Sequence, residues 1–175
     1  NEGHSAFIIF ELLRKLMVEQ KFSFNQAKNI IKARSVFTTH TPVVEGNEHF
    51  DKKLIDKYLK DKIEAIGIKY EEMMSYGEIE GDDHNFWLPA LAIRFSKYIN
   101  GVSELHSHVS RKMWHKIYPN LCDSEVPITA ITNGVDLQTW LSKQLTILYN
   151  RYVGPEYLHA SERKHVWNNV LMIPD

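Results

Sequence analysis

Hydrophobic residues recur at helical spacing along most of the chain, with short apolar runs between them. The first helical pattern covers residues 5–19, where a broad apolar stripe repeats every three or four positions. A capping box, in which Ser23 precedes Gln26 by three positions, predicts a second helix over residues 24–33. Later segments with helical spacing predict helices over residues 49–66, 70–76, 86–99, 104–118 and 140–152. Helices are therefore expected to dominate the fold.

Glycine and polar residues mark the breaks between these predicted helices. Gly67 is expected to end the helix over residues 49–66, because glycine readily adopts the left-handed conformation of a C-cap. Residues 77–85 are rich in acidic side chains and are expected to form a solvated loop. Residues 100–103 are expected to form a compact break, and the chain from Gly154 onward a terminal extension.

Two short β-branched runs interrupt the helical pattern and are typical of buried strands. The first predicts a strand over residues 35–40, and Pro42 stops it because proline has no N–H to donate to a ladder. The second predicts a strand over residues 128–132. Asn133 and Gly134 follow it and predict a turn, since both residue types tolerate positive φ. Long helical crossovers between short apolar strands indicate a parallel sheet covered by helices, so we expect a helix-rich α/β fold.

Both predicted strands end in polar residues, His40 in one case and Asn133 in the other. The carboxyl ends of parallel strands share one edge of the sheet, and ligands of open α/β sheets bind at that edge. His40 and Asn133 are therefore expected to face one crevice, as a site for the hydroxyl groups of a small polar substrate such as a sugar. Each residue also has a purely structural interpretation, as a hydrogen-bonded loop residue for His40 and as a turn residue for Asn133.

Composition narrows the possible classes of function. The 175 residues are 43% hydrophobic, which suffices for one globular domain with a real core. Basic residues number 21 and acidic residues 22, and this balance argues against binding nucleic acid or a membrane surface through bulk charge. No run is long and apolar enough to span a bilayer, and no group of side chains has the spacing of a zinc site. Cys122 is the single cysteine, so no internal disulfide forms and a reducing, cytoplasmic setting is expected.

Four segments of the chain occur in the order and at the rough spacing of a known family. They are Asn1 to Phe7, Val36 to Val43, Asn100 to His106 with Val109 to Trp114, and Ile131 to Val135 followed by Trp140-Leu141. Together they resemble the α-glucan (glycogen, starch or maltodextrin) phosphorylases, in particular the bacterial and archaeal branch. The resemblance implies a GT-B architecture, in which two Rossmann-like domains flank a cleft. Because the chain lacks an initiator methionine and any evident stop signal, residues 1–175 are expected to be a piece of a longer protein. The resemblance implies that this single fragment is a partial Rossmann-like domain with a few short parallel strands, from the later part of the N-terminal domain.

The resemblance also implies an activity and a cofactor for the parent enzyme. The family cleaves α-1,4-glucans with inorganic phosphate and releases glucose 1-phosphate. Its pyridoxal phosphate is held as a Schiff base by a lysine of the C-terminal domain, so that lysine is expected to lie outside this chain and no cofactor-binding residue is assigned here. The isolated fragment is expected to be inactive, because one wall of a cleft provides neither a positioned phosphate nor stabilisation of an oxocarbenium-like centre.

The resemblance carries two residue roles to this chain. His40 matches the family histidine at the reaction centre, whose side chain bonds the 6-hydroxyl of the glucosyl unit and whose carbonyl lies near the developing positive charge. Asn133 matches an asparagine that bonds the same hydroxyl. The segment from Asn1 to His4 matches a motif that borders the cleft, with no chemical step assigned to it. The family commonly shows Phe-Asn-Met where this chain has Phe86-Trp87-Leu88, so no polar role is carried to Trp87. Trp87 fits a core position or a sugar-stacking surface, and the core position is the preferred interpretation.

Three other interpretations fit parts of the sequence. A non-catalytic glucan-binding module would stack exposed aromatic side chains on sugars, and aromatic residues make up 11% of the chain. Another GT-B glycosyltransferase would need a nucleotide-sugar site, of which the sequence gives no sign. A structural or regulatory role would use the fragment as an association surface. Excision is expected to expose apolar faces that the rest of the enzyme covers, and self-association of the isolated piece would then be an artefact of the cut.

Overall fold

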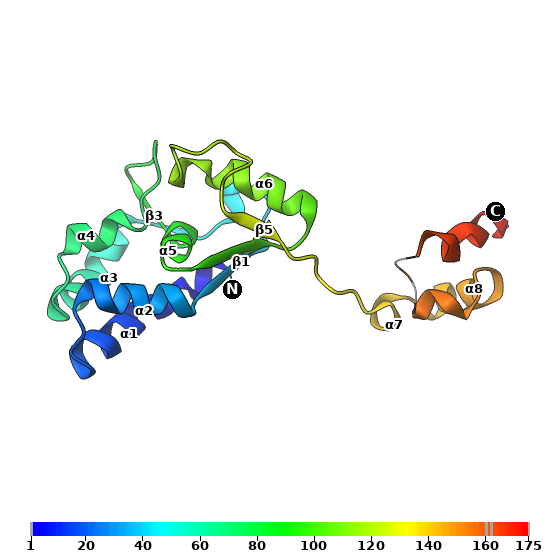
Figure 1. The fold of residues 1–175 in the computed structure, drawn as a ribbon, viewed down its shortest axis with the longest axis horizontal. Helices are drawn as coiled ribbons and strands as arrows, with labels where there is room; N and C mark the ends of the chain where they lie inside the picture. The colour runs from blue at the N-terminus through cyan, green and yellow to red at the C-terminus, as the bar shows by residue number, and fades with distance from the viewer. Residues whose placement is uncertain (1, 160, 162, 175) are drawn as a thin grey trace. The chain divides into compact units, whose positions relative to one another are not determined.

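The computed structural model describes residues 2–159, 161 and 163–174, which form two compact units. The first unit extends to Asn133 and the second begins at Gly134 (Figure 1). In the first unit the strands are β1 (Val36–Thr39), β2 (His49–Asp51), β3 (Asn85–Trp87), β4 (Tyr98–Gly101) and β5 (Ile128–Ala130). Its α-helices are α1 (Ile8–Arg14), α2 (Phe24–Arg34), α3 (Lys52–Ala65), α4 (Tyr70–Ser75), α5 (Leu88–Arg94) and α6 (Glu104–Trp114). Its other helical turns are η1 (Gly3–Phe7), η3 (Val44–Gly46) and η4 (His115–Ile117), all of 3-10 type, and the π-helix η2 (Lys15–Glu19).

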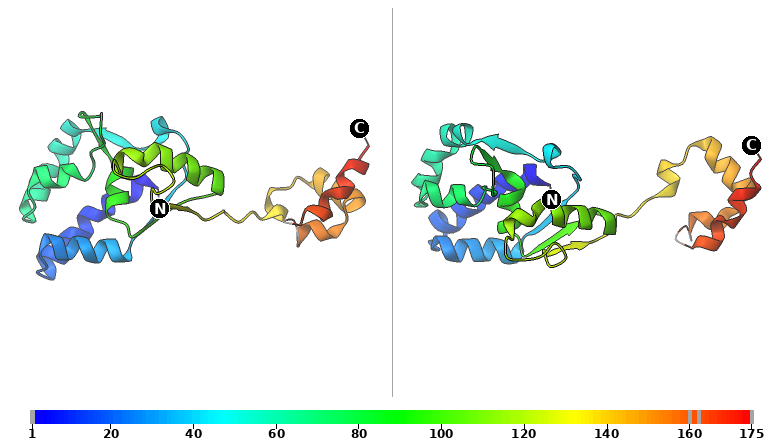
Figure 2. Two further views of the ribbon diagram at one scale, coloured as in Figure 1. Left: turned by 45° about the horizontal axis from the view of Figure 1, so that its top comes forward. Right: turned by 90° about the horizontal axis from the view of Figure 1, so that it is seen from above.

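Three parallel strands form the sheet that positions the site. They lie in the order β1-β4-β5, and Thr39 of β1 pairs with Gly101 of β4, which in turn pairs with Ala130 of β5. Helix α6 packs across β4 and β5, and Figure 2 shows it alongside the sheet. The expected helix-rich α/β class with a few short parallel strands is confirmed, and the strands predicted over 35–40 and 128–132 are β1 and β5.

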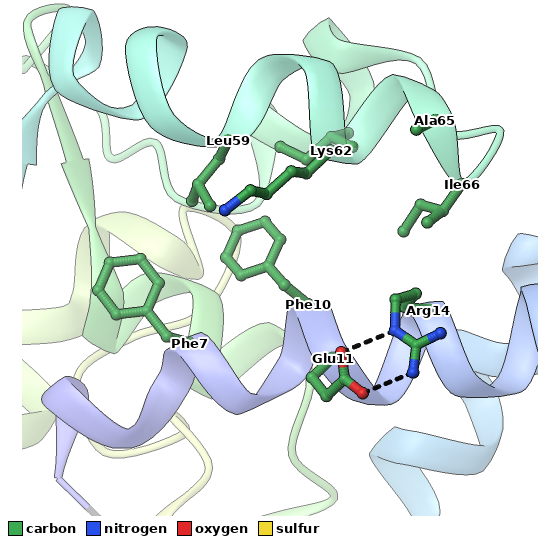
Figure 3. A pocket seen from close by; sticks show the side chains of 9 residues that line it. Phe7, Phe10, Glu11, Arg14, Leu59, Lys62, Ala65 and Ile66 are labelled. Carbon is green, nitrogen blue, oxygen red and sulfur yellow. Dashed lines mark hydrogen bonds and ion pairs between the residues drawn. The ribbon is translucent and has the colours of Figure 1, made fainter.

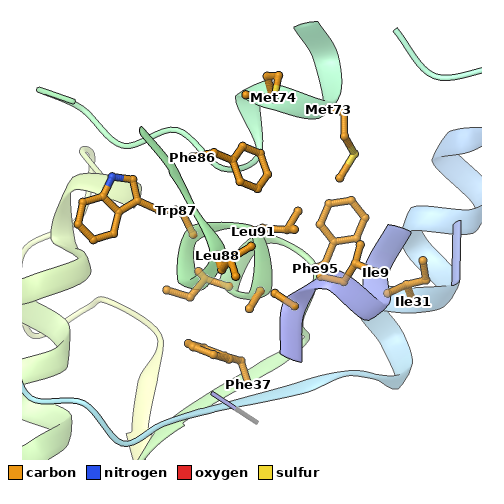
Figure 4. Close-up of a cluster of buried hydrophobic side chains, with 14 of the residues drawn as sticks. Ile9, Ile31, Phe37, Met73, Met74, Phe86, Trp87, Leu88, Leu91 and Phe95 are labelled. Atoms are coloured by element: carbon orange, nitrogen blue, oxygen red, sulfur yellow. The ribbon is translucent and has the colours of Figure 1, made fainter. Parts of the chain in front are cut away.

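The hydrophobic core of the first unit surrounds α5. Every residue of this helix from Leu88 to Ile93 is buried. Figure 4 shows Phe37 of β1 and Phe86 of β3 on opposite sides of α5, and both side chains are fully buried. A helix that is apolar all round is typical of such a central position, because each of its faces meets a packed neighbour.

The prediction of one helix over residues 86–99 is wrong, because the structure divides this segment into β3, α5 and β4. A continuous apolar run is compatible with a buried helix and with a buried strand, and periodicity alone does not separate them. The N–H of Trp87 bonds the carbonyl of Gly77 at 2.7 Å, and β4 lies between two partner strands, so distant segments decide the conformation. Asn100 and Gly101 consequently belong to β4 and not to the predicted break.

The predicted helix over residues 49–66 begins later than expected. Residues 49–51 form β2, which pairs antiparallel with β3, and α3 starts after Asp51, whose carboxylate accepts the N–H of Lys53 at 2.8 Å. Gly67 ends the helix with a φ of 84°, as predicted. The helical segment over residues 5–19 is confirmed as the succession η1, α1 and η2.

The remaining elements of the first unit follow the predictions closely. The predicted capping box of α2 is present, with the N–H of Ser23 bound to Gln26 Oε1 at 2.9 Å. The short helix predicted over 70–76 is α4, and the helix predicted over 104–118 is α6 with η4. The acidic loop over 77–85 is organised by Asp82, which accepts hydrogen bonds from side chains and backbone of the residues that follow it.

The second unit is helical throughout its regular elements. They are α7 (Leu137–Trp140), α8 (Lys143–Tyr152) and two 3-10 helices, η5 (Pro155–Leu158) and η6 (Lys164–Met172). The predicted helix over 140–152 is interrupted where Ser142 caps α8, and the expected terminal extension packs its Tyr157 and Trp167 against Tyr149. The turn predicted at Asn133-Gly134 is wrong, because neither residue has positive φ and no turn is formed there.

Candidate functional site

His40 follows β1 directly at the carboxyl end of the parallel sheet, and it is exposed. Its backbone N–H donates to Glu2 Oε1 at 3.1 Å, and the N–H of Thr41 donates to the same oxygen at 3.2 Å. One carboxylate therefore satisfies two consecutive backbone donors just beyond the strand. This contact was not predicted, since Glu2 and His40 lie 38 residues apart in the sequence.

Asn133 lies three residues beyond the end of β5, and it is also exposed. The N–H of Ile131 donates to the carbonyl of Gly101 at 3.0 Å, and the N–H of Asn133 donates to the carbonyl of Val102 at 3.1 Å. These bonds continue the parallel pairing of β4 and β5 past the ends of both strands. The structure thus places Asn133 at the same edge of the sheet as His40.

The two predicted residues follow the outer strands of the sheet, and β4 lies between these strands. Neighbouring strands are about 4.8 Å apart, so the exits of β1 and β5 are separated by roughly 10 Å. Neither the His40 nor the Asn133 side chain makes a hydrogen bond within the part of the chain that the structure describes, which leaves an imidazole and an amide exposed at one edge.

His106 supports the backbone just after β4, and it was not predicted from the sequence as a functional residue. The N–H of Val102 donates to His106 Nδ1 at 3.3 Å, so Nδ1 is the acceptor and the neutral ring carries its proton on Nε2. His106 is only 8% exposed, and its Nε2 is buried with no partner among the described residues. In the sequence, His106 is marked only as the last residue of the segment from Asn100 to His106, which resembles the corresponding segment of the α-glucan phosphorylases.

Gly101 is the residue that allows α6 to approach β4 this closely. A Cβ at this position would lie 2.8 Å from both His106 Nδ1 and Ser107 Oγ. Ser107 Oγ also donates to the carbonyl of Thr129 at 2.7 Å, and Arg111 donates to the carbonyl of Ile128 at 2.9 Å. Helix α6 is therefore tied to β5 and packed on β4, which gives the edge of the sheet a rigid support.

A polar contact between strands completes this support. Thr38 Oγ1 donates to Asn100 Oδ1 at 2.9 Å and so links β1 to β4 one residue before the strands end. Asn100 is buried, and its amide nitrogen donates to the carbonyl of Gly101 at 3.4 Å. The exits of β1, β4 and β5 are thus joined by side chains as well as by the backbone ladder.

The largely apolar cavities of the first unit lie away from this edge, between η1, α1 and α3 (Figure 3). One has a volume of about 350 Å³ and includes Phe7, Phe10 and Leu59 in its walls. Its neighbour of about 390 Å³ shares these three residues and adds Phe50 and Tyr58. Glu11, Arg14 and Lys62 also line the first cavity, and neither cavity is lined by His40 or Asn133.

Other candidate chemistry is limited in the described part of the chain. No group of three or more His, Cys, Asp or Glu side chains is placed there to hold a metal ion, and no helix among these residues is long and apolar enough to cross a membrane. Trp87 is buried against Trp114, which confirms its interpretation as a core residue. Within the motif from Asn1 to His4, Asn1 lies outside the described residues, and His4 Nδ1 is 3.5 Å from a carboxylate oxygen of Glu48.

Comparison with known proteins agrees with the resemblance of the four segments. Residues 1–168 match the Phosphorylase family model, described as carbohydrate phosphorylase. The maltodextrin phosphorylase of Thermococcus litoralis is 37% identical over 175 residues, which are 100% of this chain and 20% of that protein. The glycogen phosphorylase of Mycobacterium tuberculosis is 30% identical over 182 residues, covering 95% of this chain and 21% of that protein. The glycogen phosphorylase of Aquifex aeolicus is 28% identical, with 100% of this chain and 25% of that protein covered, so the chain spans about a fifth to a quarter of these relatives.

Proposed function

Because the chain belongs to the carbohydrate phosphorylase family, we propose that it is part of an α-glucan phosphorylase. Such an enzyme cleaves α-1,4-glucans with inorganic phosphate and releases glucose 1-phosphate. In this proposal residues 1–175 come from the N-terminal GT-B-type domain of a longer, cytoplasmic enzyme and supply one edge of its glucosyl-binding cleft. The names of the relatives, maltodextrin and glycogen phosphorylase, support this substrate class.

His40 and Asn133 are the residues that we propose to bind the glucosyl unit. Each follows one outer strand of the sheet at its carboxyl edge, with an exposed side chain. In the proposed complex His40 donates to or accepts from the 6-hydroxyl, and the amide of Asn133 bonds the same hydroxyl. The carbonyl of His40 then faces the positive charge that develops at the reacting carbon, where a fixed dipole stabilises the transition state. The observation that carries this proposal is the position of these two residues at one supported edge.

The residues of this chain do not suit the cofactor that the family implies. A Schiff-base lysine needs an enclosed pocket, whereas every lysine of this chain is exposed or only partly buried. We therefore assign pyridoxal phosphate and its lysine to another part of the parent enzyme. In the family this cofactor supplies a phosphate group next to the substrate phosphate. The isolated chain is accordingly proposed to be inactive.

Phosphorolysis assays test this function directly. The full-length protein that contains this chain is incubated with maltoheptaose, inorganic phosphate and pyridoxal phosphate, and glucose 1-phosphate is measured. We expect sustained release by the full-length protein and none by the 175-residue chain. Absence of release from the full-length protein contradicts the proposed activity, and release by the isolated chain contradicts its proposed inactivity.

A non-catalytic glucan-binding role has one observation in its favour. Trp140 in the second unit is 79% exposed, whereas Trp87 and Trp114 are buried in the first unit and are not available to stack on sugars. Titration of the isolated chain with maltoheptaose, followed by tryptophan fluorescence, discriminates this role from that of a cleft fragment. If maltoheptaose changes the fluorescence and the Trp140→Ala variant abolishes this change, sugar binding by Trp140 is favoured. If the fluorescence does not change up to millimolar sugar, the glucan-binding role is excluded.

A further inference from the structure

We propose that Glu2 is a positioning residue that holds the backbone of His40 and Thr41 in the geometry needed to bind the sugar. This inference rests on the proposed function of His40 as a sugar-binding residue. It adds to that function a group that touches no substrate and acts only through the loop after β1.

The carboxylate of Glu2 binds the exit of β1 at two successive points. Its Oε1 accepts the N–H of His40 at 3.1 Å and the N–H of Thr41 at 3.2 Å. The next residue, Pro42, has no N–H, so these two are the last backbone donors before the chain turns away. Two consecutive N–H groups that converge on one anionic oxygen form a small concave anion site, in which charge strengthens both hydrogen bonds.

The backbone of Glu2 is itself fixed to the body of the first unit. Its carbonyl accepts the N–H of Ser5 at 3.1 Å and the hydroxyl of Ser5 at 2.7 Å, which locks the residue at the start of η1. The following Gly3 packs against α5, since a Cβ there would lie 2.8 Å from Cγ of Pro89. The backbone of Glu2 is therefore fixed next to α5, which lies at the centre of the core. Because its carboxylate is bonded to the loop after β1, Glu2 attaches this loop to the core.

Glu2 accepts the first two backbone N–H groups after β1, while the part of the loop that follows them contacts η3 through Thr41 and Val43. The side chain of His40 makes no hydrogen bond within the described residues, and the two N–H groups bound by Glu2 lie beyond the last paired residue of β1. Loss of the carboxylate would leave both donors to water and allow the loop other conformations. A side chain that must meet a hydroxyl group within hydrogen-bond distance then loses its alignment, even though the fold persists.

Kinetics of full-length variants test the link between Glu2 and His40. We expect Glu2→Ala to lower kcat/KM for phosphorolysis by on the order of 10- to 100-fold, because small displacements of a binding group have effects of this size. Glu2→Gln keeps an oxygen that accepts both N–H groups and should retain most of the activity. The matched control is Glu11→Ala, which removes an exposed carboxylate paired with Arg14 on α1 and should leave kcat/KM unchanged. In a protein that already carries His40→Ala, the addition of Glu2→Ala should lower kcat/KM by less than about threefold. If the losses in kcat/KM caused by the two substitutions are instead fully additive, the proposal is overturned.

Amide exchange in the 175-residue chain decides the structural part of the proposal independently of activity. The N–H groups of His40 and Thr41 should exchange with solvent at least about tenfold faster in Glu2→Ala than in the unmodified chain, while core amides keep their rates. Unchanged exchange at both positions overturns the role of Glu2. If the full-length protein shows no phosphorolysis, the proposed function fails, and faster exchange would then support only the hydrogen bonds and not the sugar-binding role.

Discussion

Asn133 is joined to Val102 by a backbone hydrogen bond of 3.1 Å, from the N–H of Asn133 to the carbonyl oxygen of Val102. The N–H of Val102 in turn donates to Nδ1 of the buried His106. Val102, directly after β4, thus connects the His106 imidazole to a proposed sugar-binding residue through its N–H and its carbonyl. The geometry of Asn133 therefore depends on a side chain that does not reach the edge itself.

Replacement of His106 should weaken this connection. We expect His106→Ala to reduce the free energy of unfolding of the first unit by about 1–3 kcal/mol, because it leaves the N–H of Val102 without its acceptor and opens a cavity. His106→Asn, whose side-chain oxygen can take the place of Nδ1, should lose less. Urea denaturation of the two variants checks the order, and equal losses would show that the contact with Val102 contributes nothing.

Gly101 should not tolerate a side chain. Gly101→Ala places a methyl group 2.8 Å from His106 Nδ1 and Ser107 Oγ and 3.0 Å from the backbone Cα of Ser107, so α6 must move away from β4. The expected loss of stability is about 1–3 kcal/mol, as for other overpacked sites. Gly134→Ala is the matched control, since nothing lies within 4 Å of a Cβ there and its φ is not positive. A loss in Gly101→Ala no greater than in the control contradicts the close packing of α6 on β4.

Asp82 should make stability depend on pH in the acid range. Hydrogen bonds from the Asn85 side chain, and then from Trp87 and the backbone, lower the pKa of Asp82 to about 2, although burial raises it. Because the folded pKa lies below the unfolded value, this contribution is present above about pH 4 and is lost as the pH falls toward 2. Denaturation midpoints between pH 5 and 2 should therefore fall less steeply in Asp82→Asn than in the unmodified chain. Parallel pH profiles would show that the carboxylate is not linked to folding.

The sequence predicted the elements whose signals are local. The strand before His40 and the strand before Asn133 are short β-branched runs with clear breakers after them, and the capping box at Ser23 lies within four residues. These features depend on neighbours in the chain, so they can be read without knowledge of the fold. The long helical crossovers between the strands indicated a parallel sheet. Because parallel strands end at one edge of a sheet, His40 and Asn133 were predicted to lie together at that edge.

The elements that were missed depend on partners far away in the sequence. Strand β4 follows the apolar α5 without a clear break, and its Asn100 and Gly101 are residue types typical of turns. Only pairing with β1 and β5 makes this segment a strand, and only the approach of α6 explains the glycine. The contact of Glu2 with the His40 loop was missed for the same reason, because a surface-type residue near the start of the chain gives no local sign of a distant partner.

A sugar that lacks the 6-hydroxyl group shows whether His40 and Asn133 bind this group at the edge of the sheet. In the full-length enzyme, kcat/KM for glucan synthesis is compared between glucose 1-phosphate and 6-deoxyglucose 1-phosphate. We expect the unmodified enzyme to prefer glucose 1-phosphate, and we expect this preference to be smaller in His40→Ala and in Asn133→Ala, because each variant removes one of the two partners of the 6-hydroxyl. A preference that stays unchanged in both variants, despite a general loss of activity, would contradict the proposed roles of His40 and Asn133.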